Sequence, residues 1–259
     1  MKIFTVCLAF VWGGWISIAY QPCLADHLAI GVSHTRPPYI IQKGRAGIEI
    51  EIVTSALRMA GHHDVLFKFL TPQRVEFFLK QKKVDGIIIP KASNIKQKLK
   101  MEVFYSDEHL YYQNHAVTLS KNNLSVNSIS DLMQQRVLGF QNAHKYLGPE
   151  FADMAKENPR YKEKPEQSTQ LLWLFTGRTD VVIADKNIFL FHRKQAALDE
   201  KYDVSASVRF HRIFPQTPQH GVFLNKTIRD DFNEGLKLIR SNGEYDAIIK
   251  KYEEMVDIN

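Results

Sequence analysis

The sequence predicts an α/β protein of two lobes, each with a mostly parallel sheet flanked by helices. Short apolar strands alternate with helical stretches along most of the chain, and this alternation is typical of parallel α/β layers. Two apolar segments, residues 115–119 and 214–220, lie where the chain would cross between the lobes. We therefore expect residues 26–115 and 219–259 to form lobe one, and residues 116–218 to form lobe two.

The elements of the first half follow from apolar runs and from breaker residues. A run of four to six apolar residues bounded by polar, Gly or Pro residues indicates a buried strand. Thr71-Pro72 predicts a helix start, because threonine can cap a helix and proline is favoured at its first position. In chain order we expect a strand at 28–32, a helix at 50–59, a strand at 65–69, a helix after Pro72 and a strand at 84–89.

The second half continues the alternation and ends in helices. Ile228, Phe232, Leu236 and Ile239 recur at helical spacing, and Asn242-Gly243 is a helix stop. The expected strands are 136–140, 181–185, 207–213 and 221–224, and the expected helices are 129–134 (capped by Ser128), 146–156, 167–176, 187–194, 228–239 and a last one near Tyr245.

The N-terminus reads as an export signal. Lys2 supplies a positive charge, residues 3–19 are uncharged and mostly apolar, and Cys23-Leu24-Ala25 offers small residues for a signal peptidase. We expect cleavage after Ala25 and a periplasmic protein. The competing interpretation is an uncleaved anchor, because the apolar run is about as long as a short membrane span needs.

Composition excludes several kinds of site in the exported chain. Both cysteines, Cys7 and Cys23, lie in the signal, so the mature protein has no disulfide, thiol nucleophile or cysteine metal ligand. The formal charge is +6, and the basic residues are scattered, which favours solvated helix surfaces over a nucleic-acid patch. No partner nucleic acid is expected.

Catalytic and metal motifs are missing from the sequence. The ten histidines show no zinc-helix spacing, and the adjacent His62 and His63 would point opposite ways on an extended chain. No Gly-x-Ser-x-Gly elbow or Gly-rich phosphate loop is present. Glu49 and Glu51 stand two apart at a helix start, so they diverge and make no carboxylate pair. We expect neither an enzyme nor a cofactor.

Six short motifs, weak singly, occur in an order that is informative. They are Arg36-Pro37-Pro38-Tyr39 with the helix start at 47–57, Lys83-Val84-Asp85-Gly86, Tyr105-Ser106-Asp107, 128–132 with Val137-Leu138-Gly139, 177–185, and Ser241-Asn242-Gly243-Glu244-Tyr245. Together they resemble the bacterial periplasmic solute-binding proteins of the amino-acid type, the extracellular solute-binding protein family 3. The resemblance implies a two-lobe, periplasmic-binding-protein-like fold of type II with a ligand cleft between the lobes.

The resemblance also implies where a solute would be held. In that family a lobe-two aspartate meets the ligand's amino group, and Asp185 stands at that place, where its other role would be to cap the helix at Asn187. The family's arginine after the third lobe-one strand is missing. Gln97 or Lys98 takes its position, with Lys91 as a third candidate, and Ser93 is a further expected contact.

Two further departures affect the expected site. Arg36 replaces the family's stacking aromatic residue and could bind an anion, stack on a flat ligand or point into solvent. Asn142, Ala143 and His144 occupy the loop that resembles an anion-contacting turn, but without its glycine. The predicted ligand-binding residues are Arg36, Ser93, Gln97, Lys98, Asn142, His144 and Asp185.

The expected function is binding of a small polar or charged solute, an amino acid or a related molecule. The protein would act as a monomer, close its lobes on the solute and deliver it to an inner-membrane ABC permease. Two alternatives use the same fold. One is a dehydratase of prephenate-like acids, with Arg36 and Lys98 holding carboxylates and Glu49 as general acid. The other is a sensor without a transport role.

Overall fold

The structure is a computed structural model that describes residues 27–33, 35–90, 94–200 and 202–257. The predicted signal peptide lies outside the described residues, as do Lys91 and Ser93. Within the described ranges no helix is long and apolar enough to cross a membrane.

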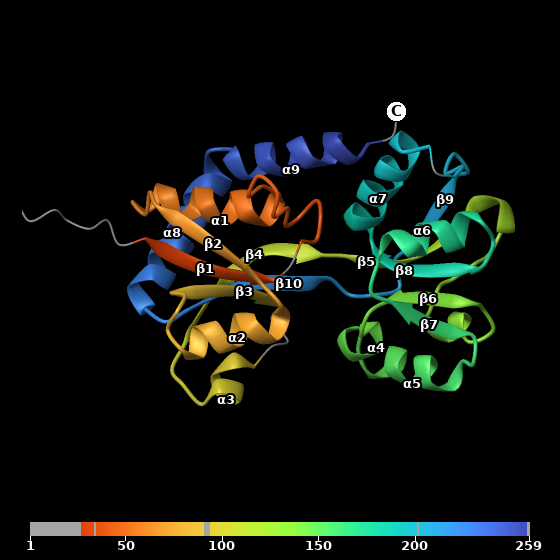
Figure 1. Ribbon diagram of the computed structural model, residues 1–259, viewed down its shortest axis with the longest axis horizontal. Coiled ribbons are helices and arrows are strands. Elements are labelled where there is room, and N and C mark those ends of the chain that lie inside the picture. Colours follow the sequence, from red (N-terminus) through yellow and green to blue (C-terminus); the bar gives the residue numbers. More distant parts are fainter. Residues whose placement is uncertain (1–26, 34, 91–93, 201, 258–259) are drawn as a thin grey trace, which may run out of the picture.

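Two five-stranded sheets lie side by side, one in each lobe (Figure 1). The lobe-one sheet has the order β2-β1-β3-β10-β4, and the lobe-two sheet has the order β7-β6-β8-β5-β9. The strands of lobe one are β1 (Leu28–Ser33), β2 (Val65–Leu70), β3 (Gly86–Pro90), β4 (Phe104–Tyr112) and β10 (Thr217–Phe223). Those of lobe two are β5 (Asn114–Leu119), β6 (Val137–Phe140), β7 (Tyr161–Lys164), β8 (Val181–Asp185) and β9 (Val208–His211).

The two sheets follow the same plan. β1 pairs in parallel with β2 and β3, and β6 pairs in parallel with β7 and β8. β10 and β5 are antiparallel to both of their neighbours. The α/β class is thus confirmed, and each sheet is mixed, because β10 in lobe one and β5 in lobe two, the strands by which the chain enters each lobe at a crossing, run against the others.

Helices cover both faces of each sheet (Figure 1). In lobe one, α1 (Ile48–Met59), α8 (Lys226–Ser241) and α9 (Glu244–Val256) lie on one face, and α2 (Pro72–Lys80) and α3 (Ile95–Leu99) on the other. In lobe two, α6 (Ser168–Phe175) and α7 (Lys186–Leu198) oppose α4 (Ala143–Tyr146) and α5 (Pro149–Glu157). Each sheet is therefore buried on both sides, which explains its continuous apolar strands.

Close packing fixes α1 against its neighbours. A Cβ at Gly235 of α8 would overlap the carbonyl of Ala56 of α1, so only glycine allows the two helices to approach this closely. Gly47, just before α1, has a φ of 122° and lies against the Tyr39 carbonyl. This contact packs the loop after β1 onto the start of α1.

The chain passes between the lobes twice. Tyr112 ends β4 in lobe one and Asn114 begins β5 in lobe two, so the first crossing is centred on Gln113. The second runs between His211 and Thr217. The Gln113 side chain donates to the Phe214 carbonyl at 2.9 Å, which ties the two crossings together. The expected division into 26–115 plus 219–259 and 116–218 stays a prediction.

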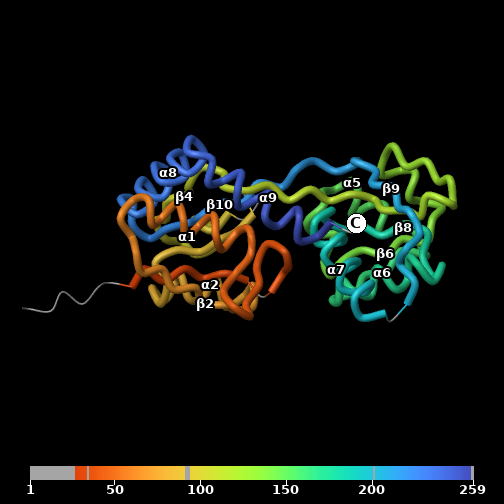
Figure 2. The backbone as a smooth tube through the Cα atoms, turned by 90° about the horizontal axis from the view of Figure 1, so that it is seen from above, coloured from red at the N-terminus to blue at the C-terminus, as the bar shows by residue number. Residues whose placement is uncertain are grey.

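The last helix connects the lobes on one edge of the molecule. α9 starts on lobe one and reaches α7 of lobe two, where Lys194 Nζ donates to the Asp257 carbonyl at 2.8 Å (Figures 1 and 2). Tyr252 of α9 is buried in the lobe-one core. The hydroxyl of Tyr252 accepts a 2.7 Å hydrogen bond from the Gly47 amide.

Several local expectations differ from the structure. The helix expected at 129–134 is a short 3-10 turn at Ser130–Leu132, where Asp131 rather than Ser128 accepts the free backbone amides. Thr71 precedes α2 but forms no capping hydrogen bond with its side chain. β4, β7, α3 and α4 were not expected from the sequence. Charged or polar residues interrupt the apolar patterns of all four, and the conformation of the two strands depends on the strands that pair with them.

Candidate functional site

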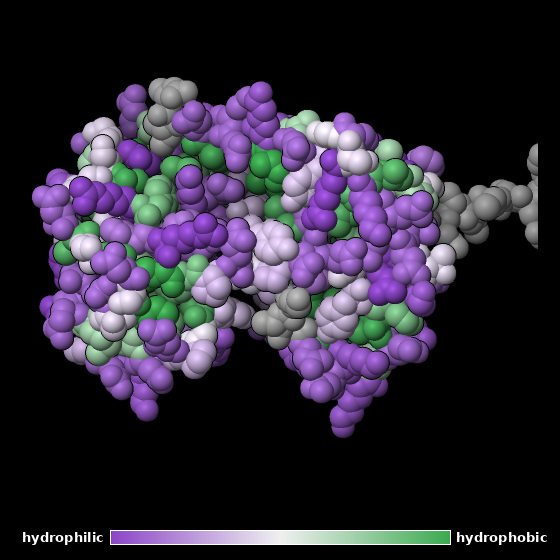
Figure 3. Space-filling model, turned by 180° about the vertical axis from the view of Figure 1, so that it is seen from behind, coloured by the Kyte–Doolittle hydropathy of each residue, from purple (hydrophilic) through white to green (hydrophobic). Residues whose placement is uncertain are grey.

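A notch separates the lobes at the edge opposite α9 (Figure 3). It lies between the α2–α3 side of lobe one and the α4–α5 side of lobe two (Figure 1). The segments after β1 and β8 meet between the lobes, because Tyr39 of lobe one contacts Asp185 at the end of β8. Carboxyl ends of strands are where open α/β sheets bind ligands.

Arg36 lies on the lobe-one side of the junction. Its guanidinium carbon stands 4.7 Å from the centre of the Tyr112 ring, and its Nη2 is 4.0 Å from Glu49 Oε2. The side chain is 30% exposed, whereas its buried Nε has no hydrogen-bond partner among the described residues. Burial would lower the pKa of Arg36, but the charges of Tyr112, Glu49 and Asp185 raise it. The guanidinium is therefore a permanent cation with an unused donor.

Glu49 is buried beneath Arg36. Its carboxylate lies 3.0 Å from His109 Nε2 and accepts a 2.9 Å hydrogen bond from the Tyr112 hydroxyl. Burial would raise the pKa of Glu49, but the hydrogen bond and charge of His109 and the charge of Arg36 lower it. Glu49 is thus a buried counter-charge that holds Arg36 and Tyr112 in place. Glu51 points elsewhere and binds Lys251, so the two carboxylates diverge as expected.

Asp185 lies at the lobe-two side of the same junction and is 4% exposed. Its Oδ1 caps α7 by accepting from the Asn187 and Ile188 amides, and it also accepts from the Tyr39 hydroxyl at 3.0 Å. Its Oδ2 accepts from the Gln113 amide at 2.8 Å. Burial raises the pKa of Asp185 despite these hydrogen bonds. Asp185 therefore caps α7 and faces lobe one at the same time.

Two stacked tyrosines connect Arg36 to Asp185. The rings of Tyr39 and Tyr112 are stacked with centroids 4.2 Å apart. Arg36 lies over Tyr112, and the hydroxyl of Tyr39 binds Asp185. The structure thus brings together the arginine of lobe one and the aspartate of lobe two.

Asn142 and His144 stand in the turn after β6. Asn142 has a φ of 62°, a left-handed conformation that asparagine adopts more readily than most residues. The amide of Asn142 donates to Glu163 Oε2 at 2.7 Å, and the amide of His144 donates to Glu163 Oε1 at 3.1 Å. Both predicted contacts are therefore engaged with a carboxylate of the chain itself.

The candidates that follow β3 lie apart from this cluster. Lys98 forms a 2.5 Å ion pair with Glu76 of α2. Gln97 is exposed on α3, and its backbone amide is bonded to the Asn94 side chain. Ser93 lies outside the described residues. None of the described contacts joins Gln97 or Lys98 to Arg36 or Asp185.

Glu163 is the main residue that the sequence reasoning missed. It lies on β7, the short edge strand beside β6, and Tyr161 on the same strand donates to it at 2.7 Å. The only signal is the alternation Tyr161-Lys162-Glu163-Lys164, which puts the tyrosine and the glutamate on one face of a strand. The alternation places both side chains on one face only if the segment is a strand, and the sequence did not predict strand β7.

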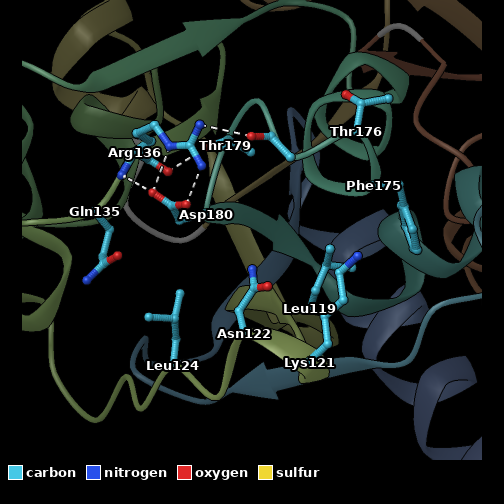
Figure 4. A pocket seen from close by; sticks show the side chains of 11 residues that line it. Leu119, Lys121, Asn122, Leu124, Gln135, Arg136, Phe175, Thr176, Thr179 and Asp180 are labelled. Atoms are coloured by element: carbon cyan, nitrogen blue, oxygen red, sulfur yellow. Dashed lines mark hydrogen bonds and ion pairs between the residues drawn. The ribbon is translucent and has the colours of Figure 1, made fainter.

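A pocket of ≈ 450 Å³ lies elsewhere on lobe two (Figure 4). Arg136 and Asp180, which precede β6 and β8, form an ion pair in its wall. The pocket is thus at the amino ends of these strands, at the opposite edge of the sheet from Asp185. Arg136 also donates a hydrogen bond to the Gly177 carbonyl.

Histidine and carboxylate pairs occur on the described surface, such as His62 with Asp231 at 2.9 Å. No group of three or more histidine, cysteine, aspartate or glutamate side chains is arranged to hold a metal ion in the described part of the chain.

Comparison with known proteins places this architecture in a family. The family model of bacterial extracellular solute-binding proteins, family 3, matches residues 28–255. The chain belongs to this family. The type II two-lobe fold and the resemblance expected from the six motifs are confirmed.

The individual relatives share only part of their sequence with this chain. An arginine-binding periplasmic protein of Mannheimia haemolytica is 28% identical over 178 residues, covering 67% of this chain and 68% of that protein. The solved arginine-, lysine-, histidine-binding protein ArtJ of Geobacillus stearothermophilus matches with a TM-score of 0.63 and 20% identity, over 88% of this chain and 95% of its own. A histidine kinase sensor domain matches with a TM-score of 0.64 and 16% identity, over 88% of this chain and 96% of its own. At such identities the solved structures show the fold alone.

Proposed function

We propose that the protein binds a small polar or charged solute, an amino acid or a related molecule, in the notch between its lobes. The observation that carries this proposal is the meeting of Arg36 from lobe one with Asp185 from lobe two, at a junction crossed by two chain segments. A zwitterion needs one partner of each sign. Binding sites favour such junctions between domains.

The charges suggest that each lobe binds a different group of the solute. Asp185 would accept the solute's amino group, because a cation beside a buried carboxylate offsets the burial that raises its pKa. Arg36 would hold an anionic group through its guanidinium, since its side chain is 30% exposed. Ser93, Gln97 and Lys98 remain predicted contacts. Gln97 and Lys98 lie on α3, so reaching the solute would require movement of that helix.

Lobe closure would couple binding to delivery. Gln113 and Phe214 tie the two crossings into one hinge, and a hinge at a few residues allows rigid lobes to close on a ligand. A closed shape populated only with solute can be recognised by an inner-membrane ABC permease. We propose a monomer that is exported to the periplasm and cleaved after Ala25.

The arginine-binding relative suggests which solutes to test first. Cationic amino acids combine an α-amino group, a carboxylate and a second positive charge. The mature chain keeps a formal charge of about +5 if Lys2 is removed from the +6 total, so any selectivity for a cation would come from local carboxylates and not from the whole-molecule field.

The dehydratase alternative is not supported. Its general acid, Glu49, is 0% exposed and bound by His109 and Tyr112, so it does not reach a substrate in the notch. Its second carboxylate holder, Lys98, is paired with Glu76. The sensor alternative rests on likeness of fold.

A thermal-shift screen of the protein purified from the periplasm tests the proposal. The panel contains amino acids, polyamines and organic acids, and the intact mass of the same sample reports cleavage after Ala25. A solute at a hundred times its dissociation constant stabilises a protein by about 2.7 kcal/mol. We expect Asp185→Asn to abolish the shift given by an amine-bearing solute, and the exposed control Asp153→Asn to keep it.

Two results would contradict this function. One is a panel in which no solute stabilises the wild-type protein. The other is an Asp185→Asn variant that is folded and binds as tightly as the Asp153→Asn control.

A further inference from the structure

A carboxylate of the chain itself occupies the turn that follows β6. Glu163 Oε2 accepts from the Asn142 amide at 2.7 Å. Glu163 Oε1 accepts from the His144 amide at 3.1 Å and from the Tyr161 hydroxyl at 2.7 Å, and it lies 2.7 Å from His144 Nδ1. Two backbone amides, an imidazole and a phenol therefore converge on a single anion.

This arrangement is built into the fold. Glu163 pairs with Gly139 in the parallel ladder of β6 and β7, so its side chain starts beside the turn it binds. The left-handed Asn142 turns its amide toward the carboxylate. Burial would raise the pKa of Glu163, but the Tyr161 and His144 hydrogen bonds lower it, so the side chain is an anion at neutral pH.

The occupied turn lies on the lobe-two side of the notch. β6 and β8 are parallel, so their carboxyl ends share one edge of the sheet, and Asp185 at the end of β8 contacts lobe one. Figure 1 shows α4, which begins at Ala143, on the side of lobe two that faces lobe one. A solute in the notch would therefore approach this turn.

We propose that Glu163 is a specificity-determining residue that fills the anion-binding turn of lobe two with the protein's own carboxylate. This inference rests on the proposed function, because a residue can determine specificity only if a solute binds in the notch. A solute carboxylate or phosphate finds the amides of Asn142 and His144 already engaged and meets a like charge. The site therefore accepts amine-bearing solutes that present a cationic or neutral group to this turn. Any anionic group of the solute faces Arg36.

A titration with inorganic sulfate tests the occupied turn without knowledge of the solute. In the wild-type protein the amide signals of Asn142 and His144 in nitrogen-15 NMR spectra should not respond to sulfate. In Glu163→Ala the four donors are released, and we expect saturable shifts of both amides. The affinity should increase at least about tenfold, which corresponds to about 1.4 kcal/mol.

Two further variants complete the test. Glu163→Gln keeps the size of the side chain but removes its charge, so sulfate should displace it and bind with an affinity between wild type and Glu163→Ala. The matched control Glu166→Ala removes a nearby exposed carboxylate and should behave as wild type. The proposal is overturned if neither Glu163 variant gains sulfate binding, if the control gains as much, or if sulfate shifts the two amides in the wild-type protein.

The solute screen fails or succeeds independently of this result. A gain of sulfate binding in Glu163→Ala together with an empty solute panel would contradict the proposed function and leave the role of Glu163 standing. A wild-type protein that binds an amino acid through its carboxylate at the amides of Asn142 and His144 would instead overturn the inference and support solute binding.

Discussion

Glu49 shows how a single buried charge organises its neighbours. It is fully buried at the start of α1, and it is surrounded by His109, Tyr112 and Arg36. A buried ion is tolerated only when partners replace the water it has lost. Removing this one carboxylate would leave a buried histidine, a tyrosine hydroxyl and a guanidinium without their common acceptor.

We therefore expect Glu49→Gln to be destabilising at neutral pH. Breaking a buried charge pair by removing one partner destabilises by about 3–5 kcal/mol. Urea unfolding followed by circular dichroism measures the loss. The control Glu254→Gln changes a carboxylate that is 68% exposed and 3.9 Å from Lys250, so it should alter stability by less than about 1 kcal/mol.

The difference between wild type and Glu49→Gln should depend on pH. The folded-state pKa of Glu49 is lowered from the ordinary value of 4.5, so its ionisation stabilises the folded state above that pH. This contribution is lost as the pH falls through the lowered folded-state pKa. Urea titrations at neutral and acidic pH should show the two proteins converging in acid. A gap that stays constant or widens would contradict this account.

Site residues were predictable where they follow a strand and hidden where they depend on pairing. Asp185 was a candidate because it ends an apolar strand at the place of the family's aspartate, and Arg36 because it precedes Pro37-Pro38 at the place of the family's aromatic residue. Glu163 was missed because nothing local shows that β7 lies beside β6. Lys98 was expected near the solute because it takes the position of the family's arginine. Its ion pair with Glu76 was not predictable, because the contact between α2 and α3 cannot be read from spacing.

At the scale of elements, apolar runs defined the central strands well. The predicted strand at 181–185 matches β8, and the expected C-terminal helix corresponds to α8. The missed elements β4 and β7 carry several polar or charged residues each. Such strands form because neighbouring strands pair with them. The sequence of the strand itself does not show which strands will lie beside it.

One hydroxyl of α9 links this helix to the start of α1. Tyr252 is buried, and its hydroxyl accepts from the Gly47 amide and donates to Glu51 Oε1. We expect Tyr252→Phe to destabilise the protein by about 1–3 kcal/mol, because the change keeps the ring but leaves a buried amide unsatisfied. Urea unfolding measures the change. The control Tyr146→Phe removes a hydroxyl from a ring that is 65% exposed and should leave stability unchanged; equal losses in both variants would refute the assigned role.

At the scale of the molecule, one side chain of lobe one makes two hydrogen bonds to lobe two. The Tyr39 hydroxyl of lobe one donates to Asp185 and accepts from the Asn187 side chain, both in lobe two. The two-lobe organisation was predictable from the apolar crossings. The identity of this interlobe contact was not, because Tyr39 and Asp185 are 146 residues apart.

Loss of this hydroxyl should open the lobes. A hydrogen bond to a charged acceptor contributes about 1.5–3 kcal/mol, which is about tenfold or more in an equilibrium. In Tyr39→Phe the ring still stacks on Tyr112, so we expect the protein to stay folded. The lost hydrogen bond between the lobes should appear as a larger radius of gyration in small-angle X-ray scattering. Tyr146→Phe again serves as control. A radius identical to that of the wild-type protein would mean that other contacts hold the lobes.

The course of α9 has a practical consequence. β1 begins at the outer end of lobe one, whereas Asp257 ends α9 on Lys194 of lobe two (Figure 1). α9 itself packs in the lobe-one core, but the residue that follows it contacts lobe two. If the proposed lobe closure shifts this contact, a donor and an acceptor fluorophore fused at the two ends of the described chain would change their separation, and the pair would report solute binding optically.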